Sequence, residues 1–175
     1  MTDQPTPEID LTADTSNLLK AYGLLVIGMP MLYVTHIAVA VIGFFIVAAS
    51  VMWVYRLRKE GGALIENHAR WIIRTFWLST LYTFFFGVIF ALVFSSHADS
   101  QGMDALMQGM QNGTASPDYV RQQVDGFYTL NHSLLIVDWL ACFTPVVLHA
   151  VWRYIKGYRL ADKGRYLPDV RTWWL

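Results

Sequence analysis

Three side chains that could handle protons or ions lie in the last of three long apolar segments, residues 132–155. Asp138, Cys142 and His149 are separated by four and seven residues, so in a helix they share one face. Because polar groups within a membrane are costly, this face is expected to look into a bundle of helices. Asp138 and His149 could then form a path for protons or ions. The alternative is that these groups hydrogen-bond between helices and fix their packing.

The histidines raise the question of a haem or metal site. A haem held by two histidines needs imidazoles at matching depths on different helices. His36, His97 and His132 are expected near the same membrane surface, and methionines in the loop after the second segment would suit a soft metal such as Cu(I). No compact His-x-His or Cys-x-x-Cys spacing accompanies them. No metal or cofactor is therefore predicted, and a haem or metal-binding membrane protein is kept as the third hypothesis.

The sequence gives little support to nucleophilic catalysis. Its single cysteine, Cys142, lies in the middle of an apolar run, where a thiolate would be costly. Neither a nucleophile-elbow nor a phosphate-loop pattern occurs. No catalytic residues are assigned, and the chain is not expected to be an enzyme.

The composition favours a membrane protein. The chain has 175 residues, of which 55% are hydrophobic and only 15% charged, and its mean hydropathy is +0.36. A soluble domain is about 45–50% apolar and about 25% charged. The 13 basic side chains are balanced by 13 acidic ones, so there is no excess of positive charge for a nucleic acid to bind.

Three apolar segments are long enough to cross a bilayer core about 30 Å thick, which takes roughly 20 residues. They cover residues 31–55, 71–94 and 132–155. Residues 17–30 have a shorter apolar core and are expected to form either an interfacial helix or a short fourth span that pairs with the next one. The predicted fold class is thus all-α, an integral membrane helical bundle.

The rest of the chain is expected to flank one helical membrane domain, residues 17–164. Residues 1–16 form an acidic flexible tail, residues 95–131 an outer loop with short amphipathic helices, and residues 165–175 a cytoplasmic tail. Bases flank the spans on one side, which places the loop between the first two spans and the C-terminus in the cytoplasm. The same bases would attract anionic lipid headgroups. They are Arg56, Arg58, Lys59, Arg70, Lys156, Arg159, Lys163 and Arg165.

A charged motif precedes the second span. Glu66, Arg70 and Arg74 are spaced four apart, so on a helix they share a face and can form a ladder of carboxylate and guanidinium groups. His68 lies off that face and is expected to meet the first loop or the bases that follow the third span. The motif either anchors the helix end or docks a partner or lipid headgroup.

The stretch ALIENHARWIIRTFW, residues 63–77, resembles a motif of a family of small bacterial multi-pass proteins. In that family a Leu/Ile-Glu-Ser/Asn-His precedes an Arg-Trp-Gln-Ile-Arg-Thr-Phe-Trp run, and Ile72 occupies the position where Gln is usual. VWRYIKGYRLADKG, residues 151–164, resembles the family's closing segment. The family is described as similar to the channel-like membrane subunit of the chloroplast inner-envelope translocon (Tic), and its bacterial members have no established activity. The resemblance implies a bacterial inner-membrane protein without implying a mechanism.

Two functional hypotheses lead. The first is a non-enzymatic inner-membrane protein that acts as an accessory or assembly subunit of a larger membrane complex, with other membrane-protein subunits or a second copy as partners and no nucleic acid. The second is a small transporter or channel that uses Asp138 and His149.

Overall fold

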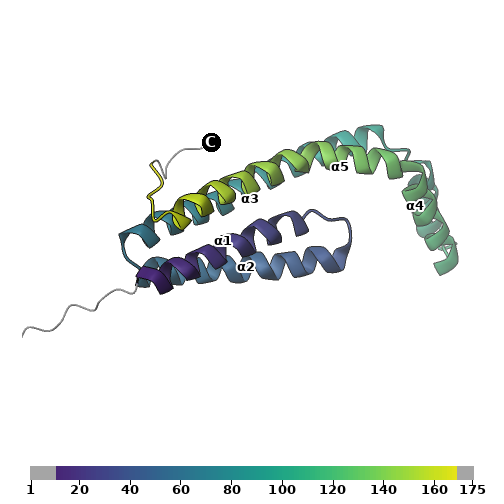
Figure 1. The fold of residues 1–175 in the computed structure, drawn as a ribbon. Coiled ribbons are helices and arrows are strands. Elements are labelled where there is room, and N and C mark those ends of the chain that lie inside the picture. Colours follow the sequence, from purple (N-terminus) through teal and green to yellow (C-terminus); the bar gives the residue numbers. More distant parts are fainter. Residues whose placement is uncertain (1–10, 169–175) are drawn as a thin grey trace, which may run out of the picture. The chain divides into compact units, whose positions relative to one another are not determined.

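Five helices make up the described part of the chain, residues 11–168 of a computed structural model, and no strand occurs there (Figure 1). The prediction of an all-α protein is therefore confirmed. Three of the helices, α2, α3 and α5, are long and apolar enough to cross a membrane. The helices are α1 (Leu11–Met31), α2 (Ile37–Glu60), α3 (Ala63–His97), α4 (Gln101–Gln111) and α5 (Pro117–Asp162).

The helix bounds differ from the predicted spans in instructive ways. The first predicted span began at residue 31, but α1 ends there and α2 begins at Ile37. The second short helix expected in the outer loop is not separate, because residues 117–131 continue into α5 without a break. The acidic tail expected over residues 1–16 lies mostly outside the described residues, and its last six residues, 11–16, belong to α1.

The described residues pack as two units. Unit 1 contains residues 11–82 and 145–168, and unit 2 contains Thr83–Thr144. Both units therefore contain parts of α3 and α5, while α1 and α2 belong to unit 1 and α4 belongs to unit 2.

In unit 1, α1 and α2 lie side by side as an antiparallel hairpin (Figure 1). Two glycines let the helices approach closely. A Cβ at Gly43 would lie 2.6 Å from the Cβ of Met31, and one at Gly28 would lie 2.9 Å from Ile46 Cγ2. The buried face of α1 recurs every three or four residues, as expected of an amphipathic helix. It consists of Leu18, Ala21, Tyr22, Leu25 and Met29, which share a core with Val47, Val51, Val54 and Leu57 of α2.

Unit 2 is stabilised by contacts between aromatic rings and by hydrogen bonds of one side chain, Asn131. The Trp139 and Phe143 rings of α5 lie 5.7 and 6.0 Å from the Phe90 ring of α3. The Asn131 side chain accepts a hydrogen bond from Asp99 N (2.8 Å) and donates one to Asp99 O (3.1 Å). These contacts join the end of α3 to α5 within this unit.

Candidate functional site

His68 is the centre of a buried polar contact between three parts of unit 1. Its imidazole is fully buried, and Nε2 lies 2.9 Å from the backbone oxygen of Arg165. A carbonyl oxygen can only accept, so Nε2 carries the hydrogen. In the neutral ring Nδ1 then accepts from the Tyr22 hydroxyl, 3.0 Å away. His68 of α3 is thus bonded to α1 on one side and to the segment after α5 on the other.

Tyr22 reaches His68 because α5 has a glycine beside it. Any Cβ at Gly157 would overlap the Tyr22 ring. The Tyr22 ring also meets the Tyr154 ring edge-on, with 6.5 Å between centroids. This close approach lets α1, α3 and α5 pack together around the Tyr22 hydroxyl.

Arg153 of α5 is held against α3 by two kinds of contact. The guanidinium carbon lies 3.7 Å from the centroid of the Trp71 ring, and the side chain is fully buried. Its Nε donates to Thr75 Oγ1 at 3.0 Å, while Trp71 Nε1 donates to the backbone oxygen of Arg153 at 3.1 Å. A cation on an aromatic face is worth about 2 kcal/mol when desolvated. These contacts fasten α3 to α5 at the level of the motif.

The segment after α5 is fastened to α3 by Asn67. The backbone N–H of Leu167 donates to Asn67 Oδ1 at 2.9 Å, and Asn67 Nδ2 donates to the Leu167 carbonyl oxygen at 3.3 Å. Leu167 itself is 3% exposed. Arg165 and Leu167, expected to belong to a tail, therefore bond to α3 through their backbones.

The charged motif forms the first ion pair of the expected ladder of carboxylate and guanidinium groups. Arg70 Nη2 lies 2.6 Å from Glu66 Oε1, with both side chains about half-exposed. An exposed pair of this kind contributes about 0.3–0.5 kcal/mol. Arg74 lies one turn further along α3 and is half-buried. His68 was expected to meet the first loop or Lys156 and Arg159, but its hydrogen-bond partners are Tyr22 and the backbone of Arg165.

The three polar residues of the third apolar segment are divided between the units. Asp138 and Cys142 belong to unit 2, where Cys142 is 8% exposed and Oδ2 of the half-buried Asp138 is buried with no hydrogen-bond partner in the described residues. His149 belongs to unit 1, where its ring meets the Tyr82 ring edge-on with 5.4 Å between centroids. Neither ring nitrogen of His149 has a hydrogen-bond partner in the described residues.

The histidines considered for haem or metal binding are all exposed. His36 comes immediately before α2, and His97 ends α3, with Nδ1 2.9 Å from the Val93 carbonyl oxygen. The His132 ring lies 5.3 Å from the Tyr128 ring. Within residues 11–168 no group of three or more histidine, cysteine, aspartate or glutamate residues is placed to hold a metal ion.

The sequence motif identifies His68 but not the partners that surround it. Trp71 and Thr75 lie within the family-like motif, and Arg153 lies near the end of the third apolar segment. The sequence did carry one signal for these partners, because a base inside an apolar span, here Arg153, needs polar or aromatic groups at its own depth. Tyr22 carried no such signal.

No protein-family model, curated protein or solved structure matches the chain. The resemblance to the Tic-like family therefore stays a prediction.

Proposed function

We propose that the chain is a non-enzymatic multi-pass protein of the bacterial inner membrane, which serves as an accessory or assembly subunit of a larger membrane complex. The observation that carries this proposal is the use of the buried polar side chains. His68 and Arg153 are fully buried and bonded to neighbouring elements. Buried polar side chains that bond neighbouring elements stabilise the packing of the helices. A stably packed bundle in lipid gives partner subunits a fixed surface to bind.

The outward surface of α2 supports the same role. Phe44, Phe45 and Met52 are 59%, 65% and 63% exposed. Large exposed apolar side chains of this kind mark surfaces that lipid or another protein covers. A second subunit, or another copy of this chain, would fit such a surface without any charged contact.

A site-specific photo-crosslinker on α2 tests the accessory role. Placed at Phe45, it should give a discrete protein adduct in native membranes, and mass spectrometry would identify the partner. Placed at Val47, which is 3% exposed on the same helix, it should give no adduct with another protein. Lipid adducts alone at Phe45, together with purification of a partnerless monomer, would contradict the proposal.

We also propose that α1 is a fourth span. Its buried face packs along α2 in an antiparallel hairpin, which favours the same membrane depth for both helices over a position flat on the surface. The start of α1 and the end of α5 would then both lie on the cytoplasmic side.

A small transporter or channel is the second candidate function. It is favoured by the buried oxygen of Asp138 and the two nitrogens of His149 that have no hydrogen-bond partner in the described residues, because such groups can exchange protons or ligate ions. Proton or ion flux into liposomes should then fall on Asp138→Asn and on His149→Ala. Flux that is absent, or equal in the wild type and both variants, would dismiss this candidate.

A further inference from the structure

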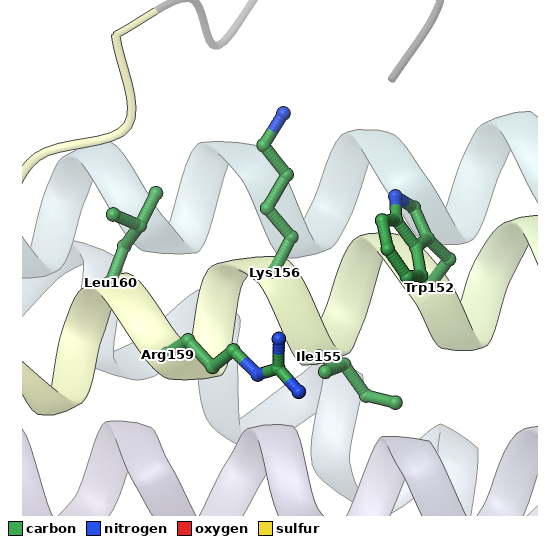
Figure 2. Close-up of a pocket in the computed structure, with 5 residues that line it drawn as sticks. All are labelled: Trp152, Ile155, Lys156, Arg159 and Leu160. Atoms are coloured by element: carbon green, nitrogen blue, oxygen red, sulfur yellow. The ribbon is translucent and has the colours of Figure 1, made fainter.

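Helix α5 carries a surface cavity of about 470 Å³ near its C-terminal end, within unit 1. The residues that line it recur at intervals of three and one, so they form one stripe along the helix. Figure 2 shows Trp152, Lys156 and Leu160 pointing to the same side of α5. The full lining is Trp152, Ile155, Lys156, Arg159 and Leu160.

Along α5 the lining begins with two apolar side chains, continues with the two bases and ends with Leu160. Trp152, 53% exposed, and Ile155 lie toward the apolar span, and Lys156 and Arg159 follow toward the end of the helix. Tryptophan and basic residues in this order are typical of the boundary between hydrocarbon and headgroups. A ligand that fits must therefore be apolar at one end and anionic at the other.

The two bases are available to such a ligand. Neither Lys156 nor Arg159 makes an ion pair within the described residues. Asp162, the nearest acid along α5, is exposed and pairs with neither base.

We infer that this cavity, which we call the α5 groove, binds one anionic phospholipid. Its phosphate lies between Lys156 and Arg159, and an acyl chain runs over Ile155 and Trp152. The inference requires only that the chain spans a membrane, and it does not depend on the proposed accessory role. Evidence against the accessory role would therefore not count against the lipid site, and the reverse also holds.

Native mass spectrometry of the full-length protein in detergent tests the groove, with phosphatidylglycerol and phosphatidylcholine of the same acyl chains as probes. The wild type should bind one phosphatidylglycerol in preference to phosphatidylcholine. Replacing both bases, Lys156→Gln with Arg159→Gln, should weaken phosphatidylglycerol binding about thirtyfold, which corresponds to roughly 1 kcal/mol for each charge. Trp152→Ala should weaken binding of both lipids.

The matched control removes the same charge elsewhere. Arg56→Gln with Arg58→Gln changes two exposed bases at the end of α2 and should alter phosphatidylglycerol binding less than twofold. The exchange Lys156→Arg with Arg159→Lys keeps both charges and should retain binding, which separates loss of charge from loss of fold. Equal losses in the α2 and α5 pairs would overturn the groove in favour of a diffuse basic surface. Displacement of the lipid by excess inorganic phosphate would overturn the phospholipid as occupant.

Discussion

Arg153 carries a positive charge into a fully buried position, where Thr75 accepts from its Nε. Thr75→Val keeps the shape of the side chain but removes that acceptor, and a buried donor left without its partner costs about 1–3 kcal/mol. We expect the variant to lose free energy of unfolding by this amount, measured by thermal or denaturant melts in detergent. Thr80→Val is the control, because the exposed Thr80 hydroxyl bonds only its own helix, at Phe76 O. Equal losses would show that Arg153 does not depend on Thr75.

The hydrogen bond from Tyr22 to His68 allows a second measurement. Tyr22→Phe removes the hydroxyl and leaves Nδ1 of the buried imidazole without its donor. The expected loss in the free energy of unfolding is again about 1–3 kcal/mol. Tyr55→Phe also removes a tyrosine hydroxyl with a hydrogen-bond partner, Trp77 Nε1, but at an exposed site, and it should cost less than about 0.5 kcal/mol. A Tyr22→Phe protein as stable as the wild type would refute the assigned role of this bond.

At the scale of elements, the α1 and α2 hairpin depends on close contact at Gly43. The methyl group of Gly43→Ala would lie 2.6 Å from Met31 Cβ, so the helices must separate, at a cost of about 1–3 kcal/mol. Gly23→Ala meets no atom within 4 Å and should be neutral or stabilise α1 by up to about 1 kcal/mol. Thermal melts of the two variants should therefore shift in opposite directions or by clearly different amounts. Matching shifts would indicate that the hairpin is loosely packed.

The long helices were predictable because hydropathy over about 20 residues identifies a span without any knowledge of its neighbours. Their ends were not. Hydropathy gives only the apolar part of α3, from residue 71, whereas the helix itself begins at Ala63, where the Arg70 to Glu66 pair and the His68 contacts satisfy the polar side chains of its first turns. The low hydropathy of those polar side chains ends the predicted span, but their hydrogen bonds and ion pair allow the helix to extend beyond it.

The candidate site was predictable in part for a related reason. His68 and the charged motif are local patterns, and residue types alone single them out. Tyr22 and His68 are 46 positions apart, and the pairing of Arg153 with Thr75 spans 78. Such pairs depend on the rotation and depth of each helix, which α1 and α5 fix through Gly157 and the Tyr22 ring. No single segment contains that information.

For the whole molecule, the proposed fourth span predicts that the start of α1 and the end of α5 lie on the same side of the membrane. In a Cys142→Ser background, an impermeant maleimide should label Gln108→Cys in spheroplasts, because the proposed topology places α4 on the outer side of the membrane. Ser16→Cys on α1 and Lys163→Cys after α5 should react only after lysis. All three positions are exposed. Labelling of Ser16→Cys in intact spheroplasts would favour three spans with α1 outside. Labelling of Lys163→Cys in intact spheroplasts would show that the orientation is opposite to the proposed one.

The two hydrogen bonds of His68 have a consequence for the synthesis of the protein. One partner, Tyr22, is made 46 positions before His68, and the other, the backbone of Arg165, is made 97 positions after it. Until the ribosome has released residue 165, the imidazole cannot have both partners, however soon α1 and α3 enter the bilayer. A product that terminates before residue 165 therefore leaves Nε2 of the buried imidazole without its acceptor, even when Tyr22 already bonds Nδ1.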